Sequence, residues 1–178
     1  MITPDTMRKV DYWAGIPICL VLTLWYKLQR LFGLKNPRYS EKPKNVLFVE
    51  LAEMGSTVIA YPSIKKLKAI YPNSNVYFVL FRHIKESMDI VNAIPKENVI
   101  TIEVSSIFTL ARDTLKFMHT CRKRKIDTVI NLETFARYST ILGYLSGARK
   151  RIGFYGYSME GLYIGNFLTH KVIYNPHI

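Results

Sequence analysis

The stretch VELAEMGSTVIAYP places two carboxylates and two hydroxyls next to a glycine. Glu50 and Glu53 are of the residue type that accepts a proton from a hydroxyl nucleophile or holds a sugar. Gly55 predicts a tight turn, after which backbone N–H groups, Ser56 and Thr57 could bind an anion or a hydroxyl. The alternative interpretation is structural. In that case Ser56 or Thr57 caps a helix, and Glu53 complements the helix dipole.

The spacing around this loop argues against the common nucleotide cofactors. A dinucleotide site requires G-x-G-x-x-G after the first strand, and a nucleoside triphosphate site requires G-x-x-x-x-G-K-[ST]. The loop has one glycine, Gly55, and no lysine at the corresponding place. The two cysteines, Cys19 and Cys121, lie far apart without a nearby Cys or His, so we expect neither a metal site nor a disulfide.

An alternation of apolar runs and helical patterns predicts the elements that position this loop. Runs typical of buried strands occupy residues 45–51, 75–81, 98–104, 127–132 and 151–155. Helical patterns occupy residues 56–70, 83–94, 105–125 and 135–145. This order predicts an α/β, Rossmann-like parallel sheet with right-handed crossovers. Ligands of such sheets bind at the carboxyl ends of the strands near the topological switch point, where residues 50–56 and 133–137 should lie.

The N-terminal segment differs in composition from the rest of the chain. Residues 12–26, YWAGIPICLVLTLWY, carry no charge, have aromatic residues at both ends and are flanked by cations. A helix of this length rises about 22 Å, short of the ~30 Å hydrocarbon core of a bilayer. We therefore predict that residues 1–35 form a membrane-interfacial helix kinked near Pro17, followed by a linker at residues 36–44. A helix packed on protein and a true membrane span are the alternatives.

The overall charge favours an anionic partner. The 178 residues carry a formal net charge of +12, with an isoelectric point near 9.7. Such a balance suits nucleic acid or an anionic lipid surface, although a solvated basic surface is a third interpretation. Aromatic residues fall mainly in the strands and the N-terminal segment rather than among the basic runs, so we expect no nucleic acid partner. The run RKRK at 122–125 ends a predicted helix and is interpreted as solvated or membrane-facing.

Two blocks of sequence resemble a known family. VLFVELAEMGSTVIAYPSIKKLKAIYPNSNVYFVLF resembles the opening of bacterial glycosyltransferase family 9, the lipopolysaccharide heptosyltransferases. Gly55, Pro62, Tyr71 and Pro72 match the family's glycine, proline and "YP" in order. Downstream, DTVINLETFARYSTILGYLSGARKRIGF resembles the family's strand, polar turn, helix, "LSGA" and "RIGF" segment. Together the blocks cover most of residues 45–155.

The resemblance implies a GT-B enzyme, in which two Rossmann-like domains face each other across a cleft. Residues 45–178 would be the N-terminal, acceptor-binding domain, and the C-terminal donor domain would be absent, so the chain alone should be inactive. The implied reaction is inverting and uses no cofactor and no metal. Where the family carries an aspartate thought to act as the base, this chain has Ser56. Glu53 is the nearest carboxylate in the loop, and we predict it as the catalytic residue.

The acceptor implied by the resemblance suggests that basic residues bind its phosphates. Lipid-linked glycans of this kind often carry phosphates, which arginine binds through two parallel hydrogen bonds. Arg82 follows the second predicted strand and Arg137 the fourth, on the predicted cleft side. The other predicted substrate-binding residues are Gly55, Ser56, Thr57 and Glu133.

The leading functional hypothesis is the acceptor-binding half of a glycosyltransferase at the cytoplasmic face of the inner membrane. It would move a sugar such as heptose from a nucleotide sugar to a lipid-linked glycan such as the lipopolysaccharide core. The alternative is a non-catalytic, membrane-associated binding module that kept the fold and lost the base.

Overall fold

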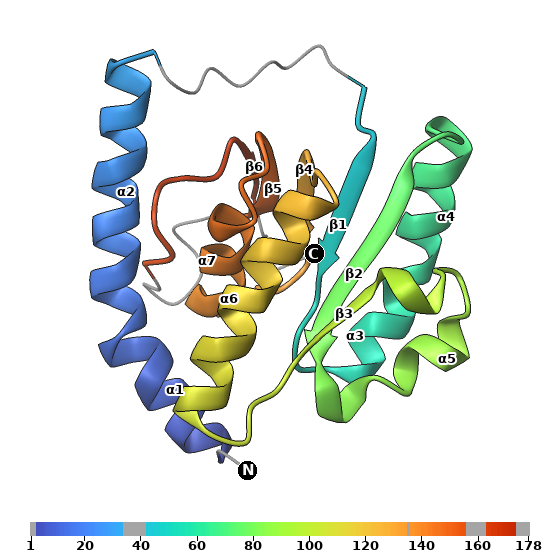
Figure 1. Ribbon diagram of the computed structural model, residues 1–178, viewed down its shortest axis with the longest axis horizontal. Coiled ribbons are helices and arrows are strands. Elements are labelled where there is room, and N and C mark those ends of the chain that lie inside the picture. The colour runs from blue at the N-terminus through green and yellow to red at the C-terminus, as the bar shows by residue number, and fades with distance from the viewer. Residues whose placement is uncertain (1–2, 34–41, 135, 156–162, 174–178) are drawn as a thin grey trace.

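The apolar runs form the strands of one parallel sheet (Figure 1). The computed structural model describes residues 3–33, 42–134, 136–155 and 163–173. Within these ranges six strands pair in the order β3–β2–β1–β4–β5–β6, and each pairing is parallel. The strands are β1 (Asn45–Val49), β2 (Asn75–Phe81), β3 (Val99–Ile102), β4 (Thr128–Asn131), β5 (Lys150–Phe154) and β6 (His170–Val172). This is the strand order of a Rossmann fold, so the predicted fold class is confirmed.

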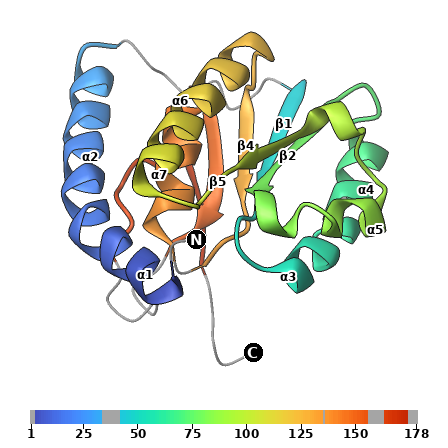
Figure 2. The ribbon, with the colours of Figure 1, turned by 60° about the horizontal axis from the view of Figure 1, so that its bottom comes forward.

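Two layers of helices cover the two faces of the sheet. They comprise α3 (Met54–Ile59), α4 (Tyr61–Ile70), α5 (Ser87–Val91), α6 (Ile107–Lys123) and α7 (Arg137–Leu145). Figure 2 shows α6 and α7 on one side of the sheet and α3, α4 and α5 on the other. Successive side chains of a strand point to opposite faces. In β1, Leu47 and Val49 therefore join the core beneath α6 and α7, whereas Val46 and Phe48 join the opposite core.

Two predicted helices are wrong as continuous elements. Residues 56–70 form α3 and α4, which meet at Ala60, and Pro62 lies in the first turn of α4. Proline has no N–H to donate, and the first turn of a helix is where that loss is tolerated. The predicted helix 83–94 is instead a 3₁₀ turn, η1 (Arg82–Ile84), followed by α5. Asn92, in the left-handed region with φ of 41°, follows the end of α5. A second 3₁₀ turn, η2 (Lys96–Asn98), precedes β3.

The predicted single N-terminal helix is also two helices. They are α1 (Pro4–Trp13) and α2 (Gly15–Leu31), which meet at Ala14. Pro17 lies in the first turn of α2, three residues after the break at Ala14, so the kink that we predicted near Pro17 is confirmed. α1 runs into α2 end to end with a bend between them, and we use the name N-terminal hairpin for this bent pair; it lies beside α7, outside the sheet (Figures 1 and 2). Most of the predicted linker at 36–44 lies outside the described residues.

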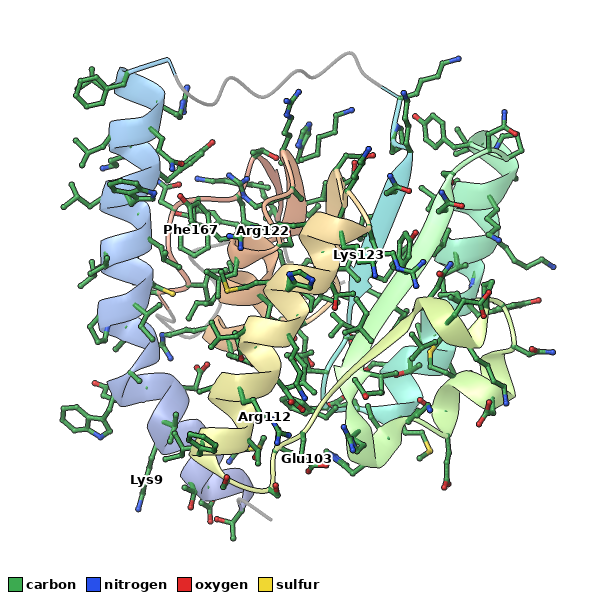
Figure 3. The ribbon with its side chains drawn as sticks, in the orientation of Figure 1. Lys9, Glu103, Arg112, Arg122, Lys123 and Phe167 are labelled. Carbon is green, nitrogen blue, oxygen red and sulfur yellow. The ribbon has the colours of Figure 1, made fainter. Side chains whose placement is uncertain are left out.

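The inner face of α2 packs on protein. Cys19 and Tyr26 are buried in a cluster with residues of α7 and with Phe167, which Figure 3 shows between α2 and α7. The Thr23 hydroxyl donates to the Cys19 carbonyl at 2.7 Å and lies 2.9 Å from the Tyr163 hydroxyl. One face of the N-terminal segment therefore belongs to the protein core, as the packed-helix alternative predicts.

The outer face of α2 is apolar and exposed. Its large exposed side chains are Ile18, Leu20, Val21, Leu24, Trp25, Leu28 and Leu31. A helix that is apolar on both faces is typical of a buried element or of one in contact with lipid. In the described part of the chain, no helix combines the length and apolar character needed to cross a bilayer.

Candidate functional site

Polar side chains meet where the carboxyl ends of β1 and β4 lie side by side. The chain runs outward from β1 through β2 to β3, then returns to β4 on the other side of β1. This reversal makes the β1–β4 boundary the topological switch point, where ligands of open α/β sheets bind. Val49 pairs with Asn131 at the end of both strands, so Glu50 and Glu133 emerge at the same edge. The sequence-based placement of these two loops is confirmed.

Glu133 is held in place by the backbone of the β1–α3 loop and by the side chain of Asn131 in β4. Its carboxylate Oε1 accepts hydrogen bonds from the backbone N–H of Leu51 at 2.8 Å and of Ala52 at 3.2 Å. Its own N–H donates to Oδ1 of Asn131 at 3.2 Å. The Asn131 amide in turn donates to the Ser139 hydroxyl at 3.1 Å. The carboxylate of Glu133 is therefore fixed against the β1–α3 loop from the side of β4.

Glu50 is a buried carboxyl beside this carboxylate. Its side chain is 4% exposed, and burial is the largest cause that raises its pKa, to about 8. The charge of Glu133, a side-chain hydrogen bond to Glu133 and the charge of Glu53 raise the same pKa further. Glu50 therefore keeps its proton at neutral pH. A carboxyl with a pKa in this range can hold or release a proton where enzymes work.

Glu53 lies at the exposed rim of the same loop. It occupies the N-cap position of α3, and its carboxylate Oε2 accepts a hydrogen bond from the Ser56 hydroxyl at 2.9 Å. Ser56 therefore orients the carboxylate that we predict as catalytic. Thr57 is fully buried, and its hydroxyl donates to the Glu53 carbonyl at 3.0 Å. That bond leaves Thr57 in a structural position rather than on the ligand-facing surface where we predicted it.

Gly55 does not form the predicted tight turn. It lies within α3 with helical backbone, and a Cβ added there would have nothing within 4 Å. The glycine is thus not required by crowding within the chain. Its missing side chain leaves open space beside Glu53 and Ser56, which is compatible with a ligand at the rim.

The two predicted arginines lie in different environments. Arg82 is exposed at the end of β2, where its Nε lies 3.4 Å from Oε2 of Glu103, at the edge that also carries Glu53. The side chain of Arg137 is 5% exposed, and its Nη1 pairs with Asp11 of α1 at 3.1 Å. Its Nε donates to the Tyr163 carbonyl at 2.8 Å. Arg137 therefore joins the N-terminal hairpin to α7 and does not present its guanidinium to a substrate, contrary to our prediction.

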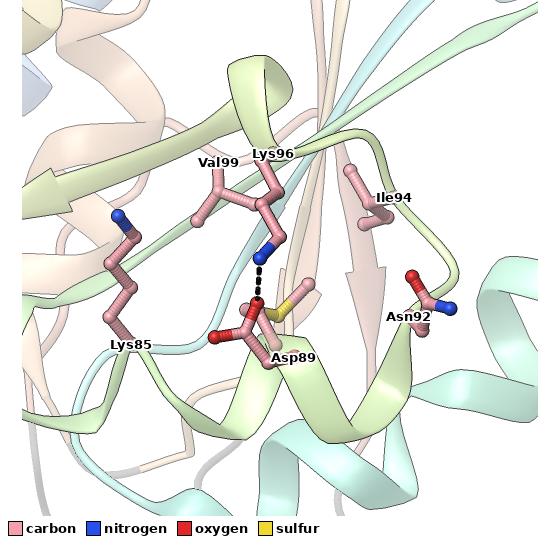
Figure 4. A pocket seen from close by; sticks show the side chains of 7 residues that line it. Lys85, Asp89, Asn92, Ile94, Lys96 and Val99 are labelled. Atoms are coloured by element: carbon pink, nitrogen blue, oxygen red, sulfur yellow. Dashed lines mark ion pairs between the residues drawn. The ribbon is translucent and has the colours of Figure 1, made fainter.

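Other polar regions lie away from this edge. Figure 3 shows Arg122 and Lys123 of the basic run near the end of α6, at the opposite end of the sheet from Glu103. A small hollow between α5 and β3 is crossed by the Lys96–Asp89 ion pair at 2.9 Å (Figure 4). Among the described residues, no group of three or more His, Cys, Asp or Glu side chains could hold a metal ion. The carboxylates at the switch point are the arrangement best suited to chemistry.

The sequence named Glu50 as a candidate proton acceptor, but its burial and its position beside Glu133, 83 positions later, were missed. Asp11 was missed altogether. Asp11 pairs with Arg137 although 126 positions separate them in the sequence, and no local sequence pattern predicts such a contact.

The fold is shared with solved glycosyltransferases. E. coli ADP-heptose lipopolysaccharide heptosyltransferase II matches with a TM-score of 0.57 and 14% identity over 74% of this chain and 35% of that one. E. coli heptosyltransferase WaaC with ADP-2-deoxy-2-fluoro heptose matches with a TM-score of 0.60 and 16% identity over 75% and 44%. The glycosyl transferase family 9 protein of Veillonella parvula DSM 2008 gives 0.56 and 16% over 75% and 36%.

The chain thus spans less than half the length of each of these proteins. No family model and no curated protein matches the sequence. The structural likeness agrees with the resemblance noted in the sequence, and the chain has the Rossmann-like fold found in the heptosyltransferases of glycosyltransferase family 9.

Proposed function

We propose that this chain is the acceptor-binding half of an inverting glycosyltransferase. It would bind a lipid-linked glycan such as the lipopolysaccharide core and direct one of its hydroxyls at a nucleotide sugar such as a nucleoside diphosphate heptose. The observation that carries the proposal is the carboxyl cluster at the switch point, where Glu50 is buried beside Glu133 and the exposed Glu53 lies in the same loop as Glu50. The fold likeness to heptosyltransferases supports the reaction class.

The proposed reaction needs one proton acceptor at this edge. A carboxylate removes the proton of the acceptor hydroxyl as its oxygen attacks the anomeric carbon of the donor. The new C–O bond forms on the face opposite the leaving group, and the bond to the nucleoside diphosphate breaks with its electron pair. Glu53 is the exposed carboxylate and is oriented by Ser56, so we assign it the contact with the hydroxyl. Glu53 thus takes the proton, and the neighbouring Glu50 and Glu133 set the local charge.

The donor would bind elsewhere. The loop after β1 lacks the glycine-rich pattern that cradles a pyrophosphate. We propose that a second domain of the GT-B type supplies this site and closes over the carboxyl end of the sheet. The solved relatives, which are more than twice as long as the matched part, are compatible with such a domain.

We propose that the N-terminal hairpin docks on the anionic surface of the inner membrane at its cytoplasmic face. The exposed face of α2 presents a row of leucine, valine and tryptophan side chains, flanked by the exposed cations Lys27 and Arg30. Lys9 extends from α1 next to the same surface (Figure 3). Apolar side chains edged by cations suit the boundary between acyl chains and anionic headgroups. A lipid-linked acceptor would then be held near the protein.

The experiment that tests the acceptor site is an NMR titration of this chain with a phosphorylated lipopolysaccharide core oligosaccharide. We expect the largest chemical-shift changes at the amides of residues 51–56, together with Arg82. The same titration with Glu53→Gln reports whether the loop still binds, and the dephosphorylated oligosaccharide reports the part played by phosphate. Shift changes confined to the hollow beside α5 would refute the assignment of the site.

The alternative of a non-catalytic binding module is supported by one observation. Ser56 occupies the position of the family's aspartate, and its hydroxyl is engaged with Glu53. Such a module would bind the oligosaccharide as above, yet the full protein would transfer no sugar from any nucleotide donor. Transfer that disappears on changing Glu53 or Glu50 would exclude the module.

A further inference from the structure

The N-terminus of α7 is capped by a residue from another element. Its N-cap residue, Ala136, has no side chain that can accept a hydrogen bond. Asp11 of α1 supplies the acceptors: Oδ1 accepts from the Tyr138 N–H at 2.9 Å and Oδ2 from the Arg137 N–H at 3.3 Å. The first N–H groups of a helix lack partners within the helix. The N-terminal hairpin therefore stabilises the start of α7.

Arg137 fixes the geometry of this cap. Its guanidinium pairs with Asp11 through Nη1, donates through Nε to the Tyr163 carbonyl and lies 5.7 Å from the centre of the Tyr12 ring. A Cβ at Gly15 would lie 2.9 Å from Cδ of Arg137, so the hairpin passes too close to Arg137 for a side chain there. A buried ion pair is costly to break on one side, because the remaining charge stays desolvated. Asp11 is thus tightly placed.

A chain of hydrogen bonds continues from α7 to the carboxyl cluster. In the first turn of α7, the Ser139 hydroxyl donates to the Ala136 carbonyl at 2.9 Å and accepts from the Asn131 amide at 3.1 Å. Asn131 accepts from the Glu133 N–H, and Glu133 accepts from the Leu51 N–H. Every link between the hairpin and the β1–α3 loop is a hydrogen bond or a helix turn. These contacts connect the N-terminus of α7 to the carboxylate of Glu133 without a gap.

We propose that Asp11 is a positioning residue for the Glu50–Glu133 pair, acting through the N-terminus of α7 and through Asn131. The membrane-docking hairpin and the acceptor site are then mechanically joined, since the residue that caps α7 belongs to the hairpin. The significance for catalysis rests on the proposed function, but the positioning itself does not. The competing role, a clamp that only attaches the hairpin, would affect stability and leave the carboxyl pair unchanged.

The test is the titration of the Glu50 carboxyl carbon by NMR in the wild-type chain and in Asp11→Asn. The charged groups that raise the pKa of Glu50 are Glu133, from the β4–α7 loop, and Glu53, from the rim. If the cap is weakened, Glu133 moves away and water reaches Glu50, so its apparent pKa should fall by roughly one unit. The matched control is Asp5→Asn, an equal charge change in the exposed first turn of α1, which should leave the titration unchanged.

Repeating the titration in a Glu133→Gln variant distinguishes positioning of Glu133 from a general destabilisation of the fold. In Glu133→Gln the pair no longer exists, so adding Asp11→Asn should cause no further change in the Glu50 titration. An unchanged Glu50 pKa in folded Asp11→Asn, or an equal fall in the Glu133→Gln background, overturns the proposal. If Asp11→Asn does not fold, Asp11→Glu keeps the charge opposite Arg137 and misplaces the cap, and an unchanged titration there also overturns it. No sugar transfer is measured, so a failure of the proposed function cannot be mistaken for a failure of this inference.

Discussion

At the scale of single residues, the loop after β1 was predictable in position and only partly in chemistry. The sequence places two carboxylates at the switch point because a buried strand ends there, and the register of Val49 against Asn131 confirms it. What the sequence could not supply is burial. Burial raises the pKa of Glu50, and so does the charge of Glu133, which belongs to a distant segment of the chain. Arg137 was misassigned for the same reason, since its partner lies in α1.

Glu53→Gln should lower kcat of the transferring protein by roughly 10²–10⁴-fold, the usual contribution of a general base. Glutamine keeps the shape and one acceptor oxygen, so the affinity for the acceptor should change little. Ser56→Ala is the matched control, because it removes the hydroxyl that orients Glu53 but leaves the carboxylate. Steady-state kinetics with varied acceptor would separate kcat from KM. A Glu53→Gln variant of full activity, beside an inactive Glu50→Gln, would transfer the role of base to Glu50.

The raised pKa of Glu50 should also appear in the pH dependence of stability. The folded chain retains this proton up to about pH 8, whereas the unfolded chain releases it near 4.5, the ordinary pKa of a glutamate carboxyl. Unfolding therefore releases a proton within this window, and the contribution of Glu50 to stability is lost as pH rises. The slope for one proton is about 1.4 kcal/mol per pH unit. Urea unfolding between pH 5 and pH 8 should show a steeper loss for wild type than for Glu50→Gln, and equal slopes would contradict the assignment.

At the scale of elements, sequence periodicity located most helices and misjudged where they break. Pro62 was placed inside one longer helix, although proline in the first turn of a new helix is favourable, whereas the kink predicted near Pro17 is present at Ala14. The short β6 has two exposed residues in three and lacks an apolar run, so periodicity could not indicate it. The N-terminal segment was predicted as interfacial or packed. The structure shows that the inner face of α2 packs on the protein. What contacts the exposed apolar outer face of α2 is the point to test.

The outer face of α2 is best tested by point variants, because deleting the hairpin would also expose its contacts with α7. Leu20→Ser with Leu24→Ser should reduce binding to vesicles containing phosphatidylglycerol several-fold, since each lost apolar contact weakens interfacial binding. Co-sedimentation at fixed lipid concentration measures the effect. Ile70→Ser is the control, because Ile70 is 57% exposed, close to 62% for Leu24, but lies on α4 across the sheet. Equal loss in both variants would exclude a specific docking face.

At the scale of the whole molecule, the fold class followed from the alternation of strands and helices, and the family resemblance agreed with the solved structures. The strand order places the carboxyl cluster at the carboxyl ends of the two central strands, β1 and β4. Helix α3 flanks the cluster on one face of the sheet and α7 flanks it on the other. The basic run lies at the opposite end of the sheet, so the +12 charge is not concentrated at the site. A substrate with phosphates would meet Arg82 rather than Arg137 at this edge.

This chain alone should bind neither nucleoside diphosphates nor nucleotide sugars tightly. The loop after β1 offers one glycine, and α3 is a six-residue helix that begins without a side-chain cap. Isothermal titration calorimetry with ADP and UDP sugars should therefore show no heat of binding above dilution at submillimolar concentrations of the sugar. A saturable isotherm in that range would place the donor site on this chain and refute the proposal that a second domain binds the donor.

The two cysteines make the hairpin's attachment measurable as a rate. Cys19 is buried between α2 and α7, where burial raises the pKa of its thiol to about 11, and Cys121 is buried in the sheet core with a pKa of about 12. A thiol reagent reaches Cys19 when the hairpin moves away from α7, and it reaches Cys121, which belongs to α6, when α6 separates from the sheet. Exchange of this kind reports local opening free energies. The labelling rates of Cys19 and Cys121, measured with and without lipid vesicles, would thus reveal whether the membrane keeps the hairpin packed on α7 or separates it from α7.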